Sequence, residues 1–174
     1  MDIAATQPAR PRTNAELVAR IARSWADLEL LVARADDDRL AKPGADGGWS
    51  AKDHLAHISA WEGRLIAFLQ GRTLADYFGL QPEELRELDI AALNARIAES
   101  NRAHLPADVL TAWRATHGQL LALLDELADA DLTAPFLDPD DPDDHRPLLG
   151  SGVLDGNTYE HYEEHVVAIR GLLA

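Results

Sequence analysis

The 174-residue sequence contains no cysteine. Disulfides, a thiolate nucleophile and thiolate metal ligands are therefore excluded, and any thiol chemistry needs a thiol from outside the chain. No apolar run approaches the roughly 18–20 residues that cross a bilayer, so we expect no membrane partner. The first residues lack a basic segment followed by an apolar stretch, which argues against a secretory signal. These absences predict a cytoplasmic protein.

Basic residues are also scarce, with 16 Lys and Arg against 30 Asp and Glu and a formal net charge of −14. A surface of this charge repels phosphate backbones, so the balance predicts that nucleic acid is not a partner. Hydrophobic residues make up 47% of the chain, enough for one buried core. Pro8 and Pro11 resist helix formation. We therefore predict a flexible lead-in at residues 1–12 and a single domain at residues 13–174.

Apolar residues recur at spacings of three and four along four stretches, which is the pattern of amphipathic helices. Thr13 with Glu16, and Ser50 with Asp53, supply polar caps for the first two helices. Pro106 kinks or divides the third stretch, because proline disrupts a helix interior. No stretch alternates as a strand does, so the predicted fold is all-α, a four-helix bundle with long connections after helices two and three. The predicted helices cover about residues 13–35, 50–71, 89–127 and 157–174, with a short helix at 82–85.

Three histidines are the main chemical feature of the sequence. His161 and His165 are four residues apart on the last predicted helix, so their rings share one face and can bind a single ion. His57, on the second predicted helix, would supply a third imidazole from a facing helix. Three protein ligands with open coordination positions are the arrangement of a catalytic metal centre. The two glutamates between the paired histidines are Glu163 and Glu164, and neither directly follows His161, so the zinc-protease motif His-Glu-x-x-His is absent and its mechanism does not transfer.

His54 is the alternative third ligand, because it lies three residues before His57 and near the same helix face. We prefer His57, since Ile58 and Trp61 place it at the edge of the apolar stripe. A further alternative is a purely structural bundle in which all of these rings are incidental. The remaining histidines are interpreted as structural or solvated: His104, His117 and His145.

The arrangement of these residues resembles the DinB-like metal-binding bundles. In that family a Trp-Ser helix start precedes the first histidine ligand, and a His-x-x-x-His pair supplies the other two. Trp49 and Ser50 stand before His57 in this chain, and the pair is His161 and His165. The resemblance implies a four-helix bundle, often a homodimer, in which the three histidines bind a divalent ion such as zinc or nickel.

The middle of the chain resembles one branch of the family, the ClbS/DfsB group. The matching stretches are residues 93–97, 101–102 and 106–110, and the family resemblance as a whole covers most of residues 13–173. Some relatives are transferases or isomerases that use mycothiol, bacillithiol or glutathione, and the branch includes a self-resistance protein that hydrolyses a cyclopropane group. The resemblance thus implies a metal-dependent hydrolase, or an S-transferase using an external low-molecular-weight thiol, that acts on an electrophilic small molecule in detoxification or self-resistance.

Two kinds of function stay open at this stage. In the first, an ion held by three neutral imidazoles keeps its full charge and acidifies a water or an incoming thiol. Glu62, Glu160 and Glu164 are then the candidate acids for orienting a ligand histidine, and Tyr159 or Tyr162 is the candidate proton donor. The alternative is a non-catalytic bundle that sequesters a small molecule, with Trp61 or Trp113 stacked against it.

Overall fold

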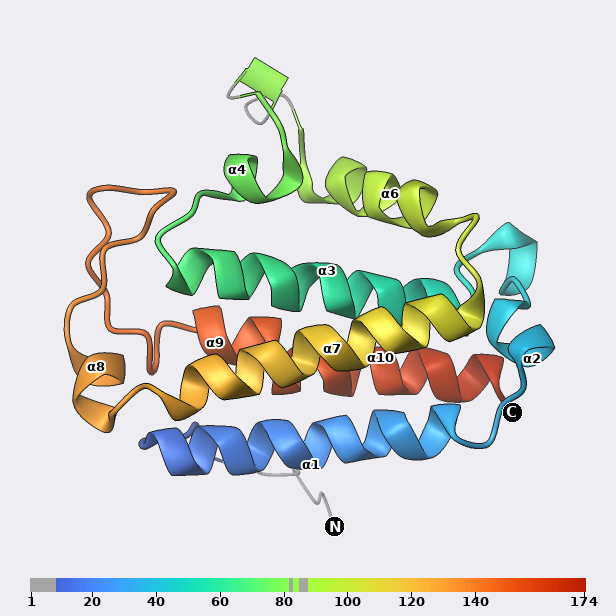
Figure 1. The fold of residues 1–174 in the computed structure, drawn as a ribbon, viewed down its shortest axis with the longest axis horizontal. Helices are drawn as coiled ribbons and strands as arrows, with labels where there is room; N and C mark the ends of the chain where they lie inside the picture. The colour runs from blue at the N-terminus through green and yellow to red at the C-terminus, as the bar shows by residue number, and fades with distance from the viewer. Residues whose placement is uncertain (1–8, 82, 85–87) are drawn as a thin grey trace, which may run out of the picture.

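The computed structural model describes residues 9–81, 83–84 and 88–174, and Figure 1 shows a bundle of helices. The all-α prediction is confirmed, since the only strand-like pairing among the described residues is an isolated bridge between Pro135 and Pro147. No helix in these ranges is long and apolar enough to cross a bilayer. The long helices of the bundle are α1 (Asn14–Val32), α3 (Ala51–Leu69), α7 (Pro106–Asp125) and α10 (Tyr159–Leu172).

Shorter helices occupy the connections between these four. A 12-residue helix, α6 (Ile90–Asn101), lies along the outer side of α3 (Figure 1). The lead-in predicted at residues 1–12 and the short helix predicted at 82–85 lie partly outside the described residues. The remaining short elements are α2 (Asp37–Ala41), the 3-10 turn η1 (Ala45–Gly47), α4 (Leu74–Phe78), α8 (Asp129–Thr133) and α9 (Val153–Asn157).

The start of α3 is fixed by the capping box that the sequence predicts. The Ser50 hydroxyl accepts a hydrogen bond from the backbone N–H of Asp53 at 3.2 Å, and the Asp53 carboxylate accepts one from the backbone N–H of Ser50 at 2.9 Å. The exchange satisfies two N–H groups that a helix start leaves without partners. Gly71, just past the other end of α3, has a φ of +75°, which glycine adopts without strain. Both ends of α3 are therefore determined locally.

Pro106 divides the third predicted helix instead of kinking it. Helix α6 ends at Asn101 and α7 begins at Pro106, where the missing N–H costs no hydrogen bond. The buried ammonium of Lys52, in the first turn of α3, donates to the carbonyls of Asn101 at 2.9 Å and Arg102 at 3.2 Å. A cation at a helix C-terminus also interacts favourably with the helix dipole. These bonds join the end of α6 to the start of α3.

The last long helix begins two residues later than the sequence predicts. Asn157 ends α9, and α10 begins at Tyr159. Thr158 between them has φ −128° and ψ −112°, which interrupts the helical backbone, and its hydroxyl donates to the Leu154 carbonyl at 2.6 Å. The periodicity of apolar residues runs through this interruption, so the sequence pattern could not show it.

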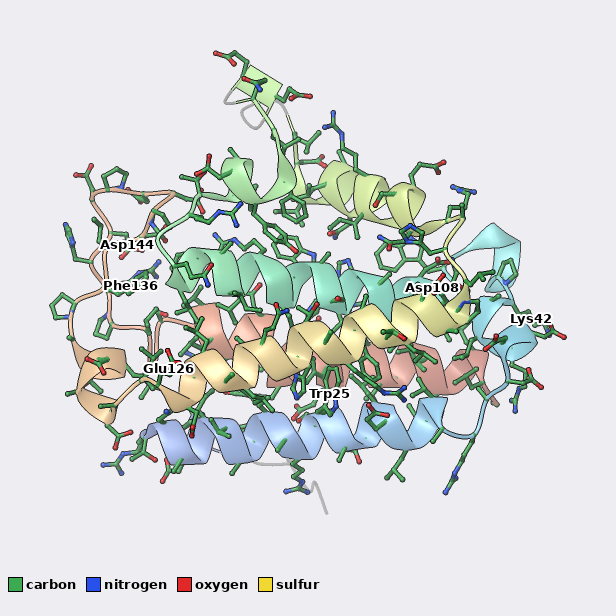
Figure 2. All side chains as sticks on the ribbon, viewed as in Figure 1. Trp25, Lys42, Asp108, Glu126, Phe136 and Asp144 are labelled. Carbon is green, nitrogen blue, oxygen red and sulfur yellow. The ribbon has the colours of Figure 1, made fainter. Side chains whose placement is uncertain are left out.

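The long acidic connection between α8 and α9 folds back onto α3. Figure 2 shows Phe136 and Asp144 on this segment at one end of the bundle. The Phe136 ring packs on Phe68 of α3 at a centroid distance of 5.0 Å. Arg64 of α3 forms an ion pair with Asp140 at 2.7 Å. One aromatic contact and one ion pair therefore link this connection to α3, and its end differs from the loop predicted over residues 133–156, because α9 begins at Val153.

A polar network crosses the apolar core and joins the four long helices. The carboxylate of Glu62 (α3), which is 0% exposed, accepts a hydrogen bond from Nδ1 of His117 (α7) at 2.8 Å and another from the hydroxyl of Tyr162 (α10). Trp25 of α1 stacks flat on His117, with ring centroids 3.5 Å apart and planes 2° apart. Figure 2 shows Trp25 directed from α1 into the bundle. The surrounding core includes Leu17, Ile21, Leu28, Leu55, Ile58, Leu65, Trp113, Leu120 and Ile169.

Candidate metal centre

The rings of His57, His161 and His165 converge between α3 and α10. The Nε2 atom of His161 lies 3.0 Å from Nε2 of His57 and 3.0 Å from Nε2 of His165. Within the described ranges, these three form the one group of at least three histidine or carboxylate side chains whose possible ligand atoms all lie within 4.8 Å of one another. The structure thus brings together three rings of which two are 104 residues apart in the chain. We call them the histidine trio.

The chemistry of the trio suits a divalent cation. A neutral imidazole carries one N–H and one lone pair, so His161 Nε2 faces two other ring nitrogens with at most one proton of its own. Hydrogen bonds cannot satisfy all of these lone pairs, whereas one shared cation can. Two nitrogens bound to zinc at 2.0–2.1 Å in a tetrahedron lie about 3.3 Å apart, close to the observed separations. The buried Nδ1 atoms of His57 and His161 have no hydrogen-bond partner among the described residues and are free to carry the protons.

Burial keeps all three rings of the trio in their neutral form. Desolvation lowers the pKa of His57 to about 3 and that of His161 to about 4. The pKa of His165 is lowered to about 2, and in both His57 and His165 the neighbouring rings contribute part of the shift, after desolvation. Neutral imidazole is the form that binds metal ions, so each ring offers a lone pair at neutral pH.

His54 lies beside the trio and contacts only one of its members. Its Nδ1 is 2.7 Å from Nδ1 of His165, the nitrogen of that ring that does not face the trio. A hydrogen bond between these atoms holds the His165 ring with Nε2 toward His57 and His161. Desolvation lowers the pKa of His54, and the charge of Asp53 opposes this shift. Of the two histidines left open by the sequence, His57 therefore converges with the pair and His54 supports it.

An open cleft of about 400 Å³ lies over the trio. The Trp49 ring packs against His57 at a centroid distance of 4.9 Å, and the Trp61 ring lies 6.2 Å from the same imidazole. The Trp61 indole N–H donates to Oδ1 of Asn94 at 3.1 Å, so α6 supplies one wall of the cleft. Any small molecule in the cleft would meet the trio and two indole rings. Besides these residues, the cleft is lined by Ile90, Gly156, Asn157 and Glu164.

The structure separates the candidate catalytic residues that the sequence suggests. Glu164 lines the cleft, whereas Glu62 and Tyr162 lie in the core network and do not line it. Burial, followed by the Glu62 carboxylate, raises the pKa of Tyr162 well above its usual value. Trp61 also lines the cleft, but Trp113 is 0% exposed and stacks on Trp25 in the core. The sequence suggested that a carboxylate orients a ligand histidine. In the structure, the group that contacts the outer nitrogen of His165 is the imidazole of His54.

The remaining histidines are not part of the cleft. His117 belongs to the core network, which agrees with its interpretation as structural. His104 is exposed and lies 3.1 Å from Oδ1 of Asn101, and His145 is exposed on the acidic connection. No sequence pattern marks Asn94 and Asn157 as cleft residues, because they lie on segments whose packing depends on the tertiary fold.

The lowered pKa values lead to a pH prediction for the metal-free protein. Between about pH 6.5, where an unfolded histidine titrates, and about pH 4, the unfolded chain binds protons that the folded trio does not. The contribution of the trio to the free energy of unfolding is therefore complete above about pH 6.5 and is lost progressively as the pH falls toward 4. Urea unfolding in the presence of a chelator measures this decline. A double variant, His57→Asn with His165→Asn, should show a shallower decline, and an equal decline would contradict the prediction.

An all-helical bundle with three converging neutral imidazoles beneath an open cleft defines a class of protein, the histidine-bearing four-helix bundles. The sequence profile of the DinB superfamily matches residues 5–154, most of the chain, and the chain belongs to this superfamily. The matched segment ends before α10, so it includes His57 but not His161 or His165. No curated protein sequence matches the chain.

Solved structures share the fold over nearly the whole chain. The sibling lethal factor precursor DfsB has a TM-score of 0.70 and 16% identity, over 91% of this chain and 94% of that one. The colibactin self-resistance protein ClbS, in complex with double-stranded DNA, has a TM-score of 0.69 and 16% identity, over 94% and 97%. An uncharacterised protein from Escherichia coli UTI89 has a TM-score of 0.68 and 14% identity, over 93% of both chains. The resemblance to the DinB-like bundles and the ClbS/DfsB group is therefore confirmed at the level of fold.

These comparisons correct one prediction. Net charge led us to exclude nucleic acid as a partner, but ClbS, a protein of the same fold, is bound to double-stranded DNA in its crystal structure. The exclusion is therefore wrong. Net charge sums over the whole surface, whereas a duplex contacts one face, so the local arrangement of basic residues matters more than the total.

Proposed function

We propose that this chain is a metal-dependent enzyme that acts on an electrophilic small molecule, by hydrolysis or by transfer of an external thiol. The observation that carries the proposal is the meeting of three neutral imidazole nitrogens at the cleft. A divalent ion such as zinc or nickel, held by the histidine trio, would supply positive charge that acidifies a water or thiol near neutral pH.

The residues around the trio have separate tasks in this proposal. His54 positions the His165 ring through the contact between their Nδ1 atoms. Trp49 and Trp61 bind the apolar part of the substrate and exclude water from one side of it. Glu164 supplies the one carboxylate among the described residues that line the cleft. Because the chain has no cysteine, a thiol nucleophile has to enter the cleft as a cosubstrate.

The first test is metal retention by protein purified without a histidine tag. We expect zinc or nickel in the purified protein by elemental analysis. Adding metal to the chelator-treated protein should raise its melting temperature, because an ion at a hundred times its Kd adds about 2.7 kcal/mol to the free energy of unfolding. If no metal is retained and none stabilises the fold, the proposal fails.

The second test is turnover by the metal-loaded protein. Monochlorobimane with glutathione or cysteine reports thiol transfer, and p-nitrostyrene oxide in buffer reports hydrolysis. We expect product beyond one equivalent of protein with one of these probes, and no such product with His161→Ala. The matched control is His104→Ala, at an exposed histidine away from the cleft. Binding of a probe without formation of product would favour the sequestering alternative.

A further inference from the structure

The described side chains that line the cleft over the histidine trio include a negative charge and no lysine or arginine. Of its lining residues in the described part of the chain, Glu164 is the only acidic one, and none is Lys or Arg. Glu164 is exposed, and its carboxylate forms no hydrogen bond or ion pair with any described residue. Such a carboxylate can accept an external cation without first losing an internal partner. Since the whole chain carries a net charge of −14, its field also draws cations toward the surface.

Two indole rings line the same cleft as this carboxylate. Trp49 and Trp61 are both partly exposed, whereas Trp113 in the core is fully buried. The hydrogen bond from Trp61 to Asn94 holds one of the two rings in a fixed orientation. Indole faces bind flat apolar groups by stacking, and they attract cationic nitrogen through the quadrupole of the ring.

We propose that the cleft selects a substrate with a planar apolar body and a positively charged nitrogen, the nitrogen facing Glu164. The inference rests on the proposed function, because it names the substrate class of the same cleft. Glu164 is then a specificity-determining residue, and the indole rings of Trp49 and Trp61 bind the planar body. Apart from the ion that the proposed function assigns to the trio, a substrate of negative charge would meet no positive group, because the described lining contains no basic side chain.

A pair of matched probes isolates the contribution of the charge. The zinc-loaded full chain is titrated calorimetrically near pH 7 with 2-(1-naphthyl)ethylamine and with 2-(1-naphthyl)ethanol, which share the ring system and differ in the cationic group. We expect the amine to bind about three- to tenfold more tightly than the alcohol, as for a partly exposed ion pair assisted by a cation–π contact. In Glu164→Gln this preference should fall below about twofold, with the affinity for the alcohol unchanged.

The matched control is Glu126→Gln, which removes the same charge at the far end of α7 (Figure 2) and should keep the full preference for the amine. Equal affinities for the two probes in the parent chain would overturn the proposal, as would a preference that survives Glu164→Gln. Loss of zinc from Glu164→Gln would also overturn it, because Glu164 would then be a metal ligand. A preference for the amine in a protein that retains no metal would instead support charge selection and refute the metal-dependent enzyme.

Discussion

Replacing His165 by alanine is expected to weaken zinc binding by roughly a hundredfold or more, and so are the same changes at His57 and His161. Each ring supplies one of three converging nitrogens. The binding free energy of a four-ligand zinc site is about 10–16 kcal/mol, so the loss of one ligand removes roughly 3 kcal/mol. Competition with a chromophoric chelator, on protein without a histidine tag, measures the change.

Two controls accompany this series. His54→Ala should weaken zinc binding only about tenfold, because His54 acts through the orientation of His165. His145→Ala, at an exposed ring on the acidic connection, should have no effect. A loss at His54 that equals the loss at His57 would show that the ligands are wrongly assigned. The helical circular dichroism signal should persist in the triple variant of the trio, because the apolar core does not include these rings.

The second large effect is expected in the core. Replacing Glu62 by alanine should lower the free energy of unfolding by about 3–5 kcal/mol, because the change leaves two buried donors without an acceptor. These donors are Nδ1 of His117 and the hydroxyl of Tyr162. Urea unfolding at neutral pH measures the change, and a loss below about 1 kcal/mol would show that the network contributes little to stability.

Metal affinity distinguishes this structural role from a catalytic one. Because Glu62 and Tyr162 do not line the cleft, Glu62→Ala and Tyr162→Phe should bind zinc as tightly as the parent chain while they remain folded. The milder variant Glu62→Gln keeps one oxygen as an acceptor and should cost less stability than alanine. If turnover falls in Tyr162→Phe at unchanged stability, the catalytic role suggested by the sequence would be restored.

The sequence predicted the parts of the fold that depend on neighbouring residues. Apolar periodicity located the four long helices, and the cap formed by Ser50 and Asp53 located the start of α3. The spacing of His161 and His165 placed both rings on one face of α10, because that relation follows from helix geometry alone. His57 was proposed as the third ligand from its place at the edge of the apolar stripe, and the family resemblance supported that choice, because no local rule connects positions 104 residues apart.

The contacts within the core network and around the trio depended on tertiary packing, so the sequence did not predict them. Glu62 and His117 are 55 residues apart, and Glu62 and Tyr162 are 100 apart, so no sequence pattern marks them as partners. The sequence suggested catalytic roles for Glu62 and Tyr162 because it does not show that both side chains are buried in the core. A glutamate or tyrosine in the core cannot be told from one in an active site by sequence alone. The contact of His54 with His165 could not be predicted for a similar reason. His54 and His57 lie near the same helix face, so spacing alone does not show which ring joins the trio and which ring orients His165.

His57 lies far along the chain from the two histidines of α10. This separation determines when, during synthesis and folding, the three rings can come together. A growing chain carries His57 long before α10 has been synthesised, so during that interval the first ring has no companions. Contacts between such remote segments form late, after local helices. Under the proposed function, the three-histidine site is therefore complete only once α10 has packed against α3, so tight binding of the ion depends on completion of folding.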